Sequence, residues 1–315
     1  MNSVVKSASY CLVHTPDMVI HNGSTQTTER IVNPESEYLV ALPKSLRSFK
    51  QAVEYMPNQS YIGNFSLEDL EKEAQPWCDR SLDGAKREGK FGEIMPQEEF
   101  LFLMQACDMF DLVHLSESFV AKYKEQFVNN PIISEDIAAR LKHGVSDDEI
   151  KHFVNDEHAE GLYHNFELVG YVKRAHDVDV NLSAHVMHEN TVSKASGVLA
   201  LLHLVKNSGL EKGDFDYVID CSEEACGDMN QRGGGNFAKA AAEIAGLSNA
   251  TGSDVRGFCA GPAHAMVMAA SLVSSGAFNN VIVSAGGCTA KLGMNGKDHV
   301  KKGLPILEDM VGAFA

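Results

Sequence analysis

The sequence of 315 residues has little of what marks non-globular chains. It contains only 26 glycines and 9 prolines, which excludes collagen-like and low-complexity classes. No apolar run reaches the roughly 18 residues that a membrane-spanning helix needs, and the first residues lack the basic-then-apolar order of a secretion signal. We therefore expect a soluble, cytoplasmic protein of about two domains, or one large α/β domain with an insertion.

Basic residues are also few. The chain has 27 lysines and arginines against 43 aspartates and glutamates, a formal net charge of −16. Such a charge repels nucleic-acid backbones and anionic lipid surfaces, so neither is expected as a partner. The acidity is concentrated in residues 21–165, which hold 26 acidic and 14 basic residues. We interpret this region as an acidic, mostly helical accessory insertion with a solvated face, or alternatively as an acidic docking surface for a partner.

Cysteine is sparse and irregularly spaced. An odd number of cysteines, at positions 11, 78, 107, 221, 226, 259 and 288, does not form the disulfide framework of a small secreted domain. The Cys221–Cys226 spacing lacks the second ligand pair of a zinc site. The glycines at 233–235 lack the Gly-Lys-Ser/Thr ending of a P-loop. Reduced thiols, one of them reactive, are expected, with no metal and no cofactor.

Strands and helices alternate from about residue 166 onward. Strands are predicted at 166–172, at 217–221 as a buried strand, at 253–257 as a short strand and at 281–285 as a continuous apolar strand. Helical segments lie between them at 192–207, 237–245 and 262–275. Such alternation is typical of a mainly parallel sheet covered by helices. The chain ends within an apolar run, 311–315, and we expect that it stops inside a domain.

Cys259 is placed between a predicted strand and a long helix of small residues. A thiol at such a turn faces unpaired backbone N–H groups and the positive end of the helix dipole, which favour a reactive thiolate and can stabilise an oxyanion. The alternative is a small buried side chain in a packed turn. His264, five residues further on, is expected to point about 140° around the helix from Cys259 and not to assist it directly.

The motif around this cysteine resembles a known family. Asp254-Val255, then Cys259-Ala260-Gly261, is similar to the active-site segment of ketoacyl synthase III enzymes of the thiolase superfamily. The resemblance implies the amino-terminal half of a thiolase-like α/β fold in residues 1–20 and 166–315, with 21–165 as the insertion. It also implies Cys259 as nucleophile and backbone oxyanion donor. The histidine and asparagine that complete that family's triad would follow in a carboxy-terminal half.

Further segments resemble a more specific family. Residues 57–59, 91–96, 181–185, 222–236, 250–261 and 290–299 are similar to the β subunits of component C in glycine/sarcosine/betaine reductase complexes. That resemblance implies an oligomer with the α subunit of component C and with selenoprotein A. It further implies conversion of a carboxymethyl group on selenoprotein A, through an acetyl thioester, into acetyl phosphate. A subunit that binds but is never acylated, and a free-standing ketoacyl synthase, remain alternatives.

Four other residues are weaker candidates for the site. Glu223 follows a predicted strand, where open α/β sheets place ligands, and is a possible acid or base beside Cys259. Arg232 adjoins the glycines at 233–235 and could help to bind an anion. Lys297 and His299 belong to the most basic stretch, predicted as a glycine-rich loop after the last strand, and could contact an acidic partner or a phosphate. Solvated or structurally paired side chains are the alternative for each.

Overall fold

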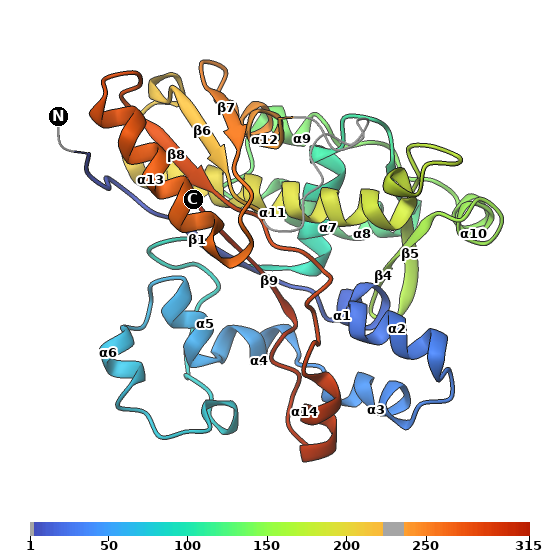
Figure 1. Cartoon of the computed structure of the whole chain (residues 1–315). Helices are drawn as coiled ribbons and strands as arrows, with labels where there is room; N and C mark the ends of the chain where they lie inside the picture. The colour runs from blue at the N-terminus through green and yellow to red at the C-terminus, as the bar shows by residue number, and fades with distance from the viewer. Residues whose placement is uncertain (1–2, 223–235) are drawn as a thin grey trace.

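The computed structural model describes residues 3–222 and 236–315. Their secondary structure confirms the α/β class, with helices packed around three three-stranded sheets (Figure 1). None of the helices in these two ranges is both long and apolar enough to cross a membrane.

The first sheet contains three of the four strands predicted after residue 166, and the strand predicted at 253–257 lies earlier, at 251–254; the strand predicted at 166–172 belongs to an antiparallel sheet instead. In the order β7-β6-β8, it consists of β6 (Tyr217–Asp220), β7 (Thr251–Asp254) and β8 (Val281–Ser284). All pairs are parallel, and Asp220 stands opposite both Asp254 and Ser284. The three strands therefore end at the same edge of the sheet.

Both faces of this sheet are covered. Val218 and Ile282 join the main core together with α12 (Phe237–Ile244). Ile219, on the opposite face, packs with Ala265 and Leu272 of α13 (Gly261–Ser274). Burial on both faces explains why β6 and β8 appear in the sequence as apolar runs rather than as alternating patterns.

The second sheet brings together distant parts of the chain. β1 (Tyr10–His14) pairs in parallel with β2 (Ile94–Pro96) and antiparallel with β9 (Met310–Phe314). A bridge between Ala285 and Phe314 connects this sheet to the end of β8. The segment 311–315 is therefore a paired strand within the sheet.

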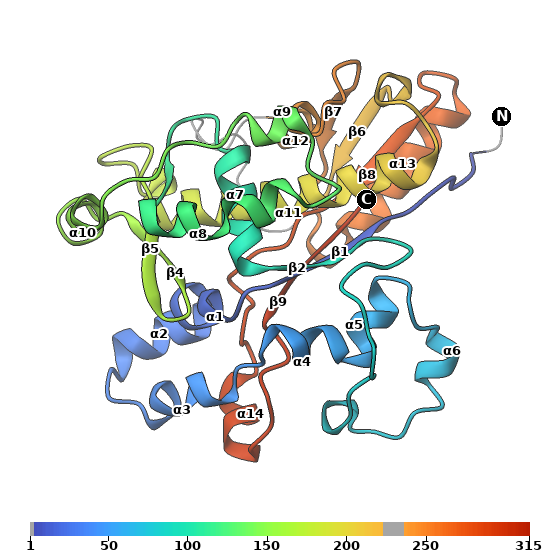
Figure 2. The same cartoon turned by 180° about the vertical axis from the view of Figure 1, so that it is seen from behind.

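The third sheet lies across the molecule from the first, as the positions of β4 and β5 relative to β6 show in Figure 2. It has the order β3-β5-β4 and is antiparallel, with β3 (Val113–Leu115), β4 (Glu160–His164) and β5 (Glu167–Val172). Asn165 and Phe166 join β4 to β5 with φ values of 51° and 67°, the left-handed conformation that tight hairpin turns require.

A long helix, α11 (Ala184–Ser208), runs through the centre of the molecule (Figure 1). It packs against α7 (Gln97–Cys107), β1, β9 and α12. Only its second half, from Val192, was predicted. Its first half buries polar residues such as His188, Asn190 and Thr191, so the amphipathic pattern that marks a surface helix is missing there.

The acidic region 21–165 is mostly helical, but it also supplies β2 to the second sheet and α7 to the main core. The remaining helices are α1 (Pro16–Asn22), α2 (Ser24–Val32), α3 (Glu37–Ser45), α4 (Phe49–Glu54), α5 (Met56–Tyr61), α6 (Leu67–Leu70), α8 (Glu117–Val128), α9 (Glu135–Ala138), α10 (Asp147–Asn155) and α14 (Gly296–Lys302). Short 3-10 turns occur at Trp77–Asp79, Val180–Leu182, Lys212–Asp214 and Phe258–Ala260.

Candidate functional site

Cys259 lies at the edge where the three parallel strands end. It is the middle residue of the 3-10 turn Phe258–Ala260 that leads from β7 into α13, and its side chain is exposed. Phe258 has a φ of 48° and is 82% exposed. A bulky residue in the left-handed region is uncommon and costs conformational energy, a feature that is concentrated at functional sites.

The start of α13 is uncapped by any side chain. Its N-cap residue is Ala260, which has no oxygen to accept from the first N–H groups, and Pro262 occupies one of the first two helical positions. The N–H groups of Ala260 and Gly261 donate to the carbonyl oxygens of Gly257 and Phe258, and Pro262 has no N–H, so what this 14-residue helix offers to the turn that carries Cys259 is the positive end of its dipole. Such an end can receive a thiolate or an oxyanion.

Two glycines allow the turn to pack closely. A Cβ atom on Gly257 would lie 3.1 Å from Nδ1 of His264, and one on Gly261 would lie 3.4 Å from the carbonyl oxygen of Cys221. The imidazole of His264 thus lies against Gly257, the residue that precedes the Cys259 turn. The start of α13 lies against the chain that leaves β6.

The other described thiols are less accessible. Cys11, Cys107 and Cys221 are buried, and Cys78 and Cys288 are half-buried. Burial raises the pKa of Cys107 and that of Cys221 to about 12, and it also raises the pKa of Cys11. Within the described ranges, Cys259 is the cysteine whose thiol is exposed.

A polar network connects the segments that leave the three strands. Asp220, at the end of β6, is 3% exposed. Its Oδ2 accepts from Nη1 of Arg256 at 2.8 Å and from the backbone N–H of Ser222 at 3.1 Å, and its Oδ1 accepts from the Ser222 hydroxyl at 2.8 Å. The same hydroxyl oxygen accepts from the N–H of Gly286 at 2.9 Å. Sequence reasoning missed this network.

The segment after β8 also fits closely against α11. A Cβ atom on Gly286 would lie 1.8 Å from the carbonyl oxygen of Ser193. The N–H of Gly287 donates to the Ser196 hydroxyl at 3.0 Å, and the N–H of Thr289 donates to Glu189 at 3.0 Å. The adjacent glycines at 286 and 287 were the one sequence signal for this close approach.

Lys297 and His299 lie elsewhere. Both belong to α14, so the predicted loop is wrong here: the stretch forms a helical turn that ends at Gly303 in the left-handed conformation. Lys297 forms an ion pair with Glu29, and Nδ1 of His299 is 3.5 Å from a Glu308 carboxylate oxygen. Figures 1 and 2 both show α14 well below α13. The structure does not bring these two residues to Cys259, and their binding role stays a prediction.

Two predicted residues, Glu223 and Arg232, lie outside the described residues, as do Cys226 and the glycines at 233–235. The structure therefore gives no geometry for their predicted roles. Within the described ranges, no group of three His, Cys, Asp or Glu side chains is arranged to hold a metal ion.

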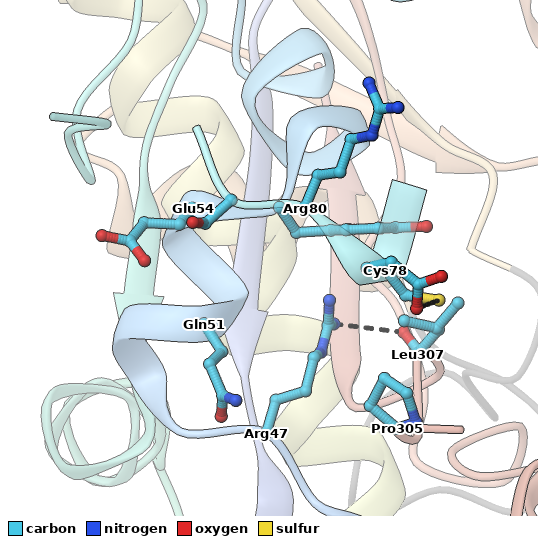
Figure 3. Close-up of a pocket in the computed structure, with 10 residues that line it drawn as sticks. Arg47, Gln51, Glu54, Cys78, Arg80, Pro305 and Leu307 are labelled. Atoms are coloured by element: carbon cyan, nitrogen blue, oxygen red, sulfur yellow. Dashed lines mark hydrogen bonds between the residues drawn. The ribbon is translucent and has the colours of Figure 1, made fainter. Parts of the chain in front are cut away.

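A cavity of about 270 Å³ lies between α4, the segment 78–81 and the segment before β9 (Figure 3). Its lining includes Arg47, Cys78, Arg80 and Leu307, but none of the predicted site residues. Arg47 donates to Asp309 and to the carbonyl oxygen of Leu307. The Arg47 side chain is thus paired with the buried carboxylate of Asp309. The cavity is separate from the Cys259 turn.

The chain is similar to known proteins in sequence and, in part, in structure. No protein-family model matches it. Two solved structures are similar in part, each with a TM-score of 0.29: the priming β-ketosynthase of the R1128 polyketide pathway and an OleA variant from Xanthomonas campestris bound with cerulenin. The first is 24% identical, covering 38% of this chain and 34% of that one. The second is 11% identical, covering 65% and 56%.

A curated relative is much more similar in sequence. The glycine/sarcosine/betaine reductase complex component C subunit beta of Peptoclostridium acidaminophilum is 60% identical over 314 residues, which is 99% of this chain. The chain spans 61% of the length of that relative. This similarity confirms the resemblance to component C β subunits that the sequence motifs predicted.

Proposed function

We propose that this chain works as an acyl-transfer subunit of component C in a reductase complex of the glycine/sarcosine/betaine type, with Cys259 as the acyl acceptor. The observation that carries the proposal is the position of Cys259: an exposed thiol, directly after the left-handed Phe258, in the 3-10 turn that precedes α13. The 60% identity to a component C subunit beta supports the choice of complex.

The chemistry follows from that position. The thiolate of Cys259 attacks the carbonyl carbon of an acyl donor, and negative charge develops on the carbonyl oxygen. The backbone N–H of Cys259, beside the positive end of the α13 dipole, stabilises this charge. The carboxyl oxygen leaves as hydroxide, and a second thiol, supplied with the selenoprotein, attacks the selenium, so that the Se–CH2 bond breaks and its electron pair takes up a proton at the methylene carbon. Selenium and that thiol are thereby oxidised to a selenenyl sulfide, and an acetyl thioester remains on Cys259. Phosphate then attacks the thioester to release acetyl phosphate and the Cys259 thiolate.

The other roles in the proposal belong to groups outside the described residues or outside this chain. Glu223 serves as the acid or base beside Cys259. The α subunit of component C and selenoprotein A are the partners, and selenoprotein A presents the carboxymethyl group. The thiols of Cys78 and Cys259, neither of them in a disulfide, suit a reducing compartment, so we place the complex in the cytoplasm.

A cysteine-to-serine series tests the proposal. Cys259→Ser replaces the thiolate with a poorly ionised hydroxyl of similar size, so acetyl phosphate formation by the reconstituted complex falls by orders of magnitude while assembly persists. Cys78→Ser, a half-buried thiol of the separate cavity, is the matched control and retains activity.

Mass spectrometry after turnover finds the acetyl mass increment on the Cys259 peptide. Near-normal acetyl phosphate production by Cys259→Ser would mean that the acetyl group never rests on this subunit. The alternative of a subunit that binds without being acylated would then hold.

A further inference from the structure

Arg256 links the nucleophile turn to the neighbouring strand. It stands two residues after β7 and three residues before Cys259, and its guanidinium Nη1 donates to Oδ2 of Asp220 at 2.8 Å. Asp220 is 3% exposed, whereas the Arg256 side chain is 34% exposed. A second carboxylate, that of Asp254, lies 3.5 Å from Nη2 of the same arginine.

Two backbone hydrogen bonds close the turn, from the N–H of Ala260 to the carbonyl oxygen of Gly257 at 3.0 Å and from the N–H of Gly261 to that of Phe258. None of the three residues Phe258–Ala260 is buried, so their side chains are not part of the described core. Phe258 is in the left-handed region, a conformation that persists only where the surroundings impose it. The bonds within the turn do not fix it to the sheet, and its place there is set from its two ends, by Arg256 on one side and by the start of α13 on the other.

Asp220 is suited to act as the fixed end. It is the last residue of β6, the central strand of its sheet. Its carboxylate accepts three hydrogen bonds, from Arg256 and from the N–H and hydroxyl of Ser222. Its backbone carbonyl accepts from the N–H of Val255 at 2.8 Å. The segments after β6 and β7 are thus joined at one buried residue, and Ser222 adds the segment after β8 through Gly286.

We infer that Asp220 and Arg256 form a positioning pair, which fixes the Cys259 turn relative to the end of β6 so that the thiol meets its acyl donor in a reactive geometry. The inference rests on the proposed function of Cys259. Neither residue is a catalytic residue: both act through the backbone of residues 257–260. A misplacement of about 1 Å at a reacting group can cost about 10²-fold in rate, so a pair of this kind can control turnover without touching the substrate.

The test compares two substitutions of the arginine in the assembled complex. Arg256→Met keeps the length of the side chain but removes its hydrogen bonds, and we expect kcat for acetyl phosphate formation to fall by about 10- to 100-fold with little change in KM. Arg256→Lys can still reach Asp220 with a charge and restores much of the rate. Arg80→Met removes an arginine that pairs with Glu73 at the surface and serves as the unaffected control.

A double variant that removes both charges separates a loss of positioning from a loss of stability. Arg256→Met alone leaves the buried Asp220 carboxylate without its partner, which itself destabilises the fold. The double variant Asp220→Asn/Arg256→Met removes that unpaired charge, so the melting temperature recovers while kcat stays low. Wild-type kcat in either Arg256→Met or the double variant would overturn the inference. So would full recovery of kcat together with the melting temperature.

Alkylation of Cys259 distinguishes a failure of this inference from a failure of the proposed function. The rate of reaction with iodoacetamide, followed as a function of pH, reports the environment of the thiol without requiring acyl chemistry. We expect the pH–rate profile of Cys259 to change in Arg256→Met and to be restored in Arg256→Lys. An unchanged profile overturns the positioning role, whereas a changed profile with an active Cys259→Ser variant would overturn the acyl acceptor alone.

Discussion

Selective labelling of the cysteines provides a quantitative test of the site. The thiolate is the species that attacks iodoacetamide and displaces iodide. A thiol with a pKa of about 12, as in Cys107 and Cys221, is ionised in only roughly one molecule in 10⁴ at about pH 8. An ordinary exposed cysteine, with a pKa of about 8.5, is ionised in about a quarter of molecules at that pH. Burial of Cys107 and Cys221 thus slows labelling about 10³-fold through ionisation alone.

The assay is a time course of iodoacetamide labelling of the native protein, resolved by peptide mass spectrometry. Cys259 is expected to label first among the described cysteines, and Cys259→Ser should abolish the fast phase. In denaturant, the same cysteines should label at similar rates, which controls for peptide detection. Labelling of Cys107 or Cys221 in the native protein as fast as that of Cys259 would refute the reasoning.

Three further predictions concern stability and surface. Burial and nearby Arg30 lower the pKa of His21 to about 4, so acid favours the unfolded chain, which takes up the proton near pH 6.5. Between about pH 7 and 5 the free energy of unfolding should fall by about 1–2 kcal/mol more in the native protein than in His21→Phe, and equal urea midpoint shifts would contradict this. Val267, 68% exposed on α13, offers apolar surface, so Val267→Lys should lower the fluorescence of a bound hydrophobic dye; unchanged fluorescence would count against that surface. Gly286→Ala should lower the free energy of unfolding in urea by about 1–3 kcal/mol because the added Cβ meets a backbone carbonyl. The control Gly213→Ala, whose Cβ meets only the end of a side chain at 3.4 Å, should be nearly neutral. Equal losses of stability in the two variants would exclude the clash.

The order of strands and helices after residue 166 could be predicted because the physical cause is local. Strands β6 and β8 are covered on both faces, and each therefore appears as an apolar run. Gly209 and Gly276 mark the ends of their helices in the left-handed conformation that glycine favours. The turn that carries Cys259 was predicted for the same reason, since strand, turn and helix are contiguous.

The missed features depend on contacts between distant residues. β2 is three residues long and ends in Pro96, so its pairing with β1 has no periodic signal. Asp220 and Arg256 are separated by a helix and a strand, and charged residues at strand ends are common in sequences that form no pair. The first half of α11 was missed because the polar residues buried there are recognisable as core only once their partners are in place.

The pairing of β1 with β9 has a consequence for how the chain folds during synthesis. Ser9 and Ala315 exchange hydrogen bonds of 2.7 and 3.1 Å, and β1 lies between β2 and β9. β2 becomes available when about a third of these residues have left the ribosome, but β9 comes last. One edge of β1 is therefore open to other strands throughout translation of this region, and closing it requires a contact of very high sequence separation. The second sheet should thus be completed only after β9 has been made, and β1 is the strand most in need of protection from aggregation until then.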